Sequence, residues 1–557
     1  MAHKTLVGGT AYNINGGKTL VGGTGYNIVG GKTLVGGTGY NIKFGGSGAY
    51  AMLYSDGTMV FQANEEVDSG KTLVNSYTGF DDVSYTSYTQ VPWNAQRSSI
   101  VTPVDNGDVE PDSMAYWFRG CSNLTGQPIC MDSVTNMACA YQDCHFTKGT
   151  PVCGPKVTNM YSAYLQCYNL TGSPVCGDNV VSMFQAYEQC HNISGNPTCG
   201  ANVENMYYAY CDCYNLTGSP VVGKKVTTLS YAYSNCVNLT GEIPYISNVI
   251  YMGGAFYNCY QLTGRPNVGT KTTNIAYAFY NCTNLTGTPL IPYNITYMNY
   301  AFYNCRNLTG NPVSSSKTRY MAYAYYFCIN LTGSPSCGAN VISMDHAYYN
   351  CHNLNGSPAC GNNVTNMRNA YYGCLNLTGS PVCGPNVTSM SGTYYGCSNL
   401  TGSPVCGENV TNMVNAYRSC YNLTGSPVCG NKVINMFSAY YYCNKLTGAP
   451  ACGVNVTNMV NTYRFCANLR GNAYFYSNKV INAANCFYSR NKSNKLSIYV
   501  PENSTTFNCL TKTSNTQSIV GYNITWTDGG THHYNSTYNI YIYPVADVAA
   551  ARAANGD

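Results

Sequence analysis

Residues 167–187 read CYNLTGSPVCGDNVVSMFQAY, and the same pattern returns every 23 residues through most of the chain. Its first cysteine recurs sixteen times without an insertion or deletion, from Cys121 to Cys466. A fixed period of this length is typical of a solenoid, in which each unit buries its apolar face only against its neighbours. The sequence therefore predicts one long stack of repeats over residues 111–489.

The second half of each unit has the form Met-x-x-Ala-Tyr-x-x-Cys, as in Met183 to Cys190. Apolar residues at i, i+3, i+4 and i+7 are typical of one face of a two-turn helix. The residue before the methionine is mostly Asn, Ser or Thr, as at Asn136, and these are preferred helix N-caps. The first half, Asn-Leu-Thr-Gly-Ser-Pro-Val, favours a short extended segment between turns. The expected fold class is an α/β solenoid whose units each hold a short strand plus a two-turn helix.

The thirty cysteines fall mainly into two columns, one of sixteen and a second of ten that stands nine residues later, as at Cys176. The second column is lost in the middle units, for example at Val222, while the first column persists there. The two columns are therefore not obligatory disulfide partners. We expect free cysteines that pack as small apolar side chains, with bridges between successive units as the alternative. A zinc site is not expected, because CxxC pairs and companion histidines are missing.

Asparagine stands two residues after the first cysteine in most units, as at Asn169 and Asn399. Many of these residues lie in Asn-x-Thr sequons, which are acceptors for glycosylation in exported proteins. The first residues, Met-Ala-His-Lys-Thr, do not resemble a secretory signal. We therefore expect an asparagine ladder that satisfies backbone groups at the turn.

A unit of the form C-x-x-L…V-T-x-M-x-x-A-[FY]-x-x-C resembles the BspA-like leucine-rich repeats of bacterial surface proteins, and the resemblance covers residues 111–489. The Ala-Phe pairs at Ala255-Phe256, Ala278-Phe279 and Ala301-Phe302 carry the same ending. Methionine replaces the usual Ile or Leu, and Gly-Ser-Pro stands where that family has aliphatic strand residues. The resemblance implies a leucine-rich-repeat-like solenoid on a surface protein.

Residues 1–45 hold three copies of a 14-residue unit that begins KTLVGGT. A short β-rich run, a Gly-Gly turn and an alternating Tyr-Asn-Ile run predict a hairpin in each copy. These copies are similar to sequences in virion-associated proteins of phages that infect gut bacteria. We expect an attachment or oligomerisation role; a flexible glycine-rich arm is the alternative.

β-Rich regions are expected on both sides of the repeats. Residues 46–110 form an adaptor with a hairpin at 50–61, and Trp117 and Phe118 provide a large aromatic pair that caps the first unit. Residues 490–557 form a C-terminal cap with strands at 495–501 and 538–544. His532 and His533 are expected in a surface loop and not at a metal.

Composition narrows the possible functions. Charged residues make up only 9% and the formal net charge is +5, so no basic stripe points to nucleic acid or an anionic membrane. No apolar run approaches the roughly 18 residues that a membrane span needs. Histidines and carboxylates do not recur beside a nucleophile, so we expect a protein that is not an enzyme and uses neither cofactor nor metal.

The free positions of the repeat are rich in Tyr, Asn, Ser and Gly, as in antibody binding loops, and we expect them to face outward. Such a surface suits the binding of sugar rings or a protein partner; a mutual stacking ladder that only stiffens the solenoid is the alternative. The candidate ligand-binding residues are Tyr257, Tyr280, Tyr303, Tyr326, Tyr349, Tyr372, Tyr395, Tyr207 and Tyr208.

These features favour a non-enzymatic virion-associated adhesin, such as a receptor-binding tail fibre, that recognises a bacterial surface glycan or protein. It is expected to join other virion proteins through the N-terminal repeats, to form a homo-oligomer, and neither to bind nucleic acid nor to insert into a membrane. A self-assembling filament or spacer protein, and a bacterial cell-surface adhesin located outside the cell, are the two alternatives.

Overall fold

The computed structural model describes residues 48–557 and, before them, only the backbone of six short strands. These strands form three antiparallel pairs, one in each 14-residue unit, and in the first pair Lys4 lies opposite Asn13. The Gly-Gly turns expected between them lie outside the described residues. The strands are β1 (Lys4–Val7), β2 (Thr10–Asn13), β3 (Lys18–Val21), β4 (Thr24–Asn27), β5 (Lys32–Val35) and β6 (Thr38–Asn41).

A four-stranded sheet precedes the repeats, in the order β10-β8-β7-β9. The predicted hairpin is present as β7 and β8, joined through Gly57, whose φ of +81° suits glycine. Two short 3₁₀ segments, Tyr88–Gln90 and Asn94–Ser99, connect β9 to β10. The strands are β7 (Tyr50–Tyr54), β8 (Thr58–Gln62), β9 (Leu73–Thr78) and β10 (Thr102–Asp105).

An aromatic cluster joins this sheet to the first coil. Trp117 is buried and stacks on Phe61 at 5.0 Å, while Trp93 meets Trp117 edge-on at 5.4 Å and donates its indole N–H to the Trp117 carbonyl at 2.7 Å. Phe118 begins the buried aromatic column of the repeats by stacking on Tyr141. The predicted aromatic cap is therefore present.

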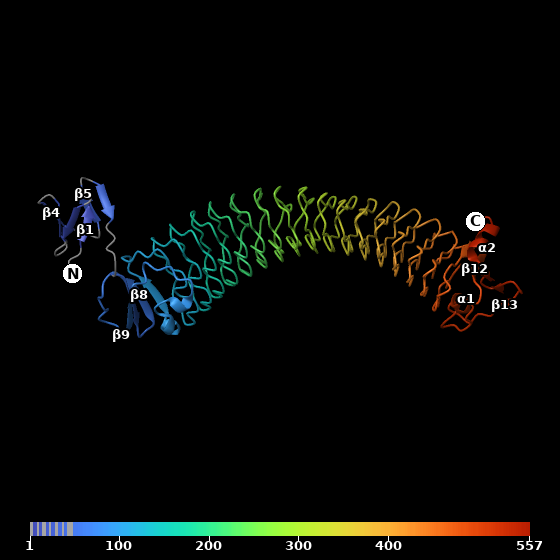
Figure 1. The fold of residues 1–557 in the computed structure, drawn as a ribbon, viewed down its shortest axis with the longest axis horizontal. Helices are drawn as coiled ribbons and strands as arrows, with labels where there is room; N and C mark the ends of the chain where they lie inside the picture. The colour runs from blue at the N-terminus through green and yellow to red at the C-terminus, as the bar shows by residue number, and fades with distance from the viewer. Residues whose placement is uncertain are drawn as a thin grey trace.

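The repeats form a long, curved stack of coils (Figure 1). Parallel β-bridges join equivalent residues of successive coils, beginning Ser113 to Asn136 to Asn159 and continuing to Asn482. Backbone N–H groups on this side donate to carbonyls of the next coil, as Met137 does to Asn159 at 2.9 Å and Tyr141 to Ala163 at 2.8 Å. These bonds run along the stack and hold the coils in register.

The predicted two-turn helix is wrong, because residues 111–489 contain no helix. Met-x-x-Ala and Tyr-x-x-Cys instead form two successive β-turns, with Ala140 N bonded to the Met137 carbonyl and Cys144 N to that of Tyr141. The third residue of each turn, Cys139 or Asp143, has a positive φ, which no α-helix tolerates.

The residue before the methionine keeps its expected capping chemistry in a different setting. Asn136 Oδ1 accepts from Ala138 N at 3.0 Å, and Asn159 Oδ1 accepts from Tyr161 N at 3.0 Å. This contact is an Asx turn that opens the first β-turn of the coil. The same side-chain chemistry therefore serves a turn where the pattern predicted a helix terminus.

A buried ladder of stacked aromatic rings runs through the core from Phe118 to Phe487. Its tyrosine hydroxyls bind the backbone on the opposite side of the coil. Tyr187 Oη accepts from Val175 N at 3.2 Å and donates to the Val175 carbonyl at 2.6 Å. Where the ladder changes to Phe256, the equivalent residue on that side is Pro244, which has no N–H to satisfy. Phe279 and Phe302 lie opposite Asn267 and Leu290, which keep their N–H groups, so the match between ring and backbone holds only for Phe256.

All thirty cysteines are free thiols. In the first column every thiol after Cys121 donates to a carbonyl of the preceding coil, as Cys167 does to Tyr141 at 3.1 Å and Cys190 to Tyr164 at 3.0 Å. In the second column Cys176 Sγ accepts from Gly200 N at 3.2 Å. Both columns thus serve packing and backbone satisfaction between coils.

The asparagine ladder at the turn is confirmed. Asn169 Nδ2 donates to the His145 carbonyl at 3.0 Å, Asn422 donates to that of Ser398 at 2.9 Å, and Asn192 reaches Asn169 Oδ1 at 3.4 Å. These bonds satisfy carbonyls of the turn in the previous coil.

The C-terminal region closes the stack with a five-stranded sheet in the order β11-β12-β15-β14-β13. Strands β12 and β15 occupy the two runs predicted as strands, and β11, β12 and β15 are parallel, as are the coils. Among the described residues, no helix is long and apolar enough to cross a membrane. The elements are β11 (Gly471–Tyr474), β12 (Leu496–Pro501), α1 (Thr505–Leu510), β13 (Thr527–Asp528), β14 (His533–Asn535), β15 (Ile540–Val545) and α2 (Val548–Ala554).

Candidate binding surface

The seven tyrosines singled out from the sequence form one continuous stack, which we call the tyrosine stripe. Adjacent rings are nearly parallel and their centres lie 4.4–4.7 Å apart. Every side chain is half-buried. The tyrosine stripe consists of Tyr257, Tyr280, Tyr303, Tyr326, Tyr349, Tyr372 and Tyr395.

Mutual stacking determines what the stripe offers to a ligand. Each inner ring has both faces covered by its neighbours, so ring edges and hydroxyl groups remain for outside contacts. Burial, followed by the neighbouring tyrosines, raises the pKa of Tyr280, Tyr326 and Tyr372 to about 12. The hydroxyls are therefore neutral at physiological pH and can both donate and accept hydrogen bonds.

A second aromatic column lies beside the stripe. Tyr277, Tyr300, Tyr323 and His346 stack in series at 4.4–4.8 Å. The two columns meet at an angle, with Tyr323 and Tyr326 5.6 Å apart and tilted by 41°. Together they make an aromatic face two columns wide across four coils.

Tyr207 and Tyr208 lie on earlier coils. Tyr208 occupies the second column and stacks on Tyr231 at 4.9 Å, after which Gly254 interrupts that column. Tyr207 stands one column further out, stacks on Phe184 at 5.2 Å and meets Tyr208 edge-on at 4.5 Å. The structure thus brings Tyr208 into line with the aromatic face and leaves Tyr207 at its margin.

The stack continues beyond Tyr395 through arginine and tyrosine side chains that were not identified from the sequence. Arg418 lies between Tyr395 and Tyr441, with its Cζ 5.3 Å and 4.5 Å from the two ring centres. Arg464 follows between Tyr441 and Tyr488, at 5.6 Å and 4.4 Å. Both arginines stand in register with the stripe, so the 23-residue column itself was the signal that could have identified them.

Ring spacing indicates which side of the curved stack carries the stripe. Over the same coils the buried ladder has a spacing of 5.2–5.9 Å, against 4.4–4.7 Å in the stripe. In a curved stack, equivalent atoms lie closer together on the inner side of the bend. The shorter spacing of the stripe is the one expected on the concave side, where solenoids carry extended binding surfaces.

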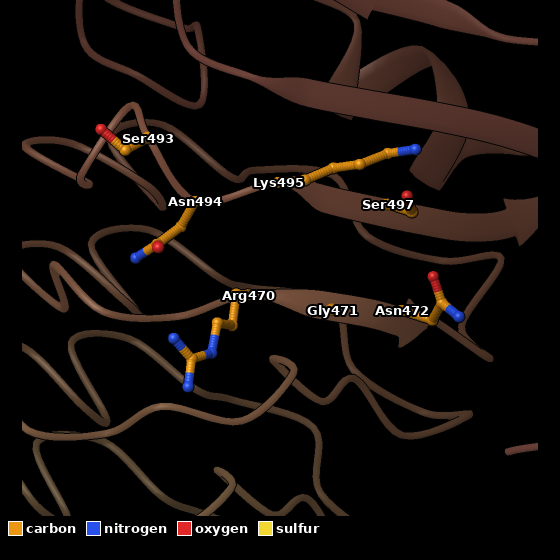
Figure 2. Close-up of a pocket in the computed structure, with 7 residues that line it drawn as sticks. All are labelled: Arg470, Gly471, Asn472, Ser493, Asn494, Lys495 and Ser497. Carbon is orange, nitrogen blue, oxygen red and sulfur yellow. The ribbon is translucent and has the colours of Figure 1, made fainter.

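A separate open cleft of about 550 Å³ lies where the coils meet the C-terminal sheet (Figure 2). The Lys495 ammonium lies 4.7 Å from the centre of the Tyr541 ring, and the Arg470 side chain points away from Lys495. None of the lining residues is acidic, although Asn472 donates to Asp557 Oδ2 at 2.9 Å. Across residues 48–557 no group of three metal-ligating side chains occurs. The lining residues are Arg470, Gly471, Asn472, Ser493, Asn494, Lys495 and Ser497.

Comparison with known proteins finds a similar type of repeat. Residues 203–332 and 340–447 match the BspA type leucine-rich repeat region, in six copies. These two ranges are similar to leucine-rich repeats of the BspA type. A leucine-rich repeat protein from Bacteroides ovatus ATCC 8483 is a similar solved structure, with 14% identity, a TM-score of 0.36, and coverage of 80% of this chain and 98% of that one. Comparison with curated proteins finds no match.

The matched BspA-type repeats contain most of the candidate surface. They include all seven residues of the tyrosine stripe, the second column beside it, and Arg418 and Tyr441. Arg464 and Tyr488 lie on the coils that follow the match. The candidate surface is therefore a property of the repeats, and not of the flanking sheets.

Proposed function

We propose that the protein is a non-enzymatic adhesin, carried on a phage virion, that recognises a bacterial surface glycan or protein through the concave face of its BspA-type repeats. The observation that supports this most is the two-column aromatic face, which places neutral hydroxyls and ring edges on the inner side of a curved stack. Tyrosine provides a large contact area at low entropic cost, and interfaces are enriched in it.

The stripe suits recognition through hydroxyl groups more than sugar stacking, because its inner ring faces are already covered. A polyhydroxylated glycan or a polar protein surface offers complementary donors and acceptors along the row of phenols. The N-terminal hairpin units are proposed to join the chain to other virion proteins and to assemble it into a homo-oligomer, which would add avidity to weak single contacts.

Binding to host bacteria tests the proposal. Fluorescently labelled full-length protein is expected to label the host, and the Tyr280→Ala/Tyr326→Ala variant to lose at least about tenfold in apparent affinity, as for truncation of interface hot spots. Tyr245→Ala/Tyr293→Ala is the matched control, because these two tyrosines are 69% and 66% exposed and lie outside the stripe. Equal binding by the two variants would contradict a role for the stripe.

The virion location needs its own measurement. Gold-labelled antibody against the repeats is expected to decorate phage particles in electron micrographs, at a site that also carries the N-terminal units. Labelling of the envelope of uninfected bacteria, with bare particles, would favour the bacterial cell-surface alternative.

A self-assembling filament is the second candidate, favoured by the continuous stacking of the stripe and by the low charge of the chain, 9%. Sedimentation of purified protein separates the two proposals. A discrete oligomer that binds host cells supports the adhesin, whereas fibres that grow from the protein alone support the filament.

A further inference from the structure

The charge of the chain is unevenly distributed, although its total is near neutral. Residues 48–215 carry five Lys or Arg and sixteen Asp or Glu, a net of −11. Residues 216–557 carry nineteen Lys or Arg and seven Asp or Glu, a net of +12. Within residues 391–490 there are seven basic residues, and Glu408 is the one acidic residue. The coils beyond the tyrosine stripe therefore attract anions.

Two of these basic residues are held in fixed positions in register with the tyrosine stripe. Arg418 and Arg464 are inserted between tyrosine rings, and stacking restrains each guanidinium while its edge remains able to donate. Neither arginine forms an ion pair in the described part of the chain. Arg464 Nη1 reaches Asn461 Oδ1 at 3.3 Å, which leaves most of its donors free.

Polar atoms without a protein partner gather around the same two arginines. Arg418 Nε, Arg464 Nε, Asn415 Oδ1 and Ser438 Oγ are all buried and lack a hydrogen-bond partner, and Ser438 is 1% exposed. Asn415, Ser438 and Asn461 occupy the column next to Arg418, Tyr441 and Arg464. Neither Asn415 Oδ1 nor Ser438 Oγ engages the two guanidinium groups, so the outer guanidinium donors are not used by these neighbours.

We propose that Arg418, Tyr441 and Arg464 form a subsite for the acidic groups of an anionic polysaccharide. This inference deepens the proposed adhesin function and rests on it. Each guanidinium pairs with a carboxylate through charge-assisted hydrogen bonds, and Tyr441 contacts the sugar between the two acids.

The spacing of the arginines selects among acidic polymers. The two guanidinium carbons lie on opposite sides of the Tyr441 ring, 4.5 and 5.6 Å from its centre, so they are at most about 10 Å apart. This distance is comparable to the length of one disaccharide. Any acidic polymer can place two acids one disaccharide apart, but a polymer with an acid on every sugar also brings a third carboxylate to Tyr441, where no cation lies between the two arginines. The subsite therefore favours a polymer in which an acidic sugar alternates with a neutral one.

Isothermal titration of the full-length protein with hyaluronan octasaccharide, whose glucuronic acid alternates with N-acetylglucosamine, tests the subsite. Arg418→Gln/Arg464→Gln is expected to weaken binding at least about tenfold, since each change removes hydrogen bonds to a charged group. Lys432→Gln/Lys445→Gln is the matched control, because it removes the same charge from two exposed lysines of neighbouring coils and is expected to bind as the unmodified protein does.

Each result decides the question. Equal losses in the arginine and lysine variants, or equal binding of carboxyl-reduced hyaluronan, would overturn the subsite, and so would stronger binding of a polyuronate with an acid on every sugar. Host-cell labelling separates this failure from failure of the adhesin. Cells labelled equally by unmodified protein and the arginine variant leave the adhesin intact without the subsite, whereas unlabelled cells contradict both proposals.

Discussion

The buried tyrosine ladder makes a quantitative prediction for the substitution Tyr187→Phe. Phenylalanine keeps both ring contacts, at 5.4 Å to Tyr164 and 5.5 Å to Tyr210, and removes only the hydroxyl. That hydroxyl satisfies both the N–H and the carbonyl of Val175. An unsatisfied buried polar group costs about 1–3 kcal/mol, so we expect a loss of about 2–4 kcal/mol in the free energy of unfolding.

Urea unfolding followed by circular dichroism measures this loss, and hydrogen exchange locates it. Tyr161→Phe is the matched control, because its ring is 42% exposed and stacks at 4.8 Å on Phe184, which already lacks a hydroxyl. We expect the control to change stability by less than about 0.5 kcal/mol. In Tyr187→Phe the Val175 amide should exchange faster than in the unmodified protein. Equal stability of the two variants, with unchanged exchange at Val175, would refute the reasoning.

Three further predictions follow from the fold. Burial raises the pKa of the buried thiols, at Cys176 from 9.0 to about 12. As the pH rises, the unfolded chain therefore loses these protons before the folded chain does, and the free energy of unfolding should fall between about pH 9 and 12. An unchanged urea midpoint at pH 7 and pH 10.5 would contradict this. Gly254→Ala places a Cβ 2.3 Å from the Tyr231 ring at a φ of +63° and should cost more than the roughly 1 kcal/mol expected for Gly79→Ala, where φ is +69° and space is open; thermal melts compare them. Trp93→Phe removes the indole bond to the first coil and should increase hydrogen exchange there before exchange rises in the middle coils.

The stacking of the repeats could be predicted from the sequence, because a stack of coils depends on apolar residues at fixed intervals. The conformation within the unit could not. Apolar positions at i, i+3, i+4 and i+7 fit a two-turn helix and equally fit the buried corners of two consecutive β-turns. The two conformations differ in the left-handed backbone at residues such as Gln185 and Gln189, with φ of 53° and 61°. Glutamine has no preference for a positive φ, so its presence does not predict that conformation.

The candidate surface was predicted in part, for a related reason. The run from Tyr257 to Tyr395 is visible because one residue type repeats. Its continuation through Arg418 and Arg464 is visible only when the column is followed regardless of residue type. The chain-wide net charge of +5 likewise conceals two regions of opposite sign, because their charges nearly cancel in the total.

The hydrogen bonds between coils have a mechanical consequence. They run along the stack, so a pull on its two ends loads every interface in series, and the weakest interface opens first. Each coil that opens releases 23 residues, or about 80 Å of extended chain, in place of a single ring spacing of 4.4–5.9 Å. A stack of this kind lengthens in steps under load and dissipates the energy of a sudden pull.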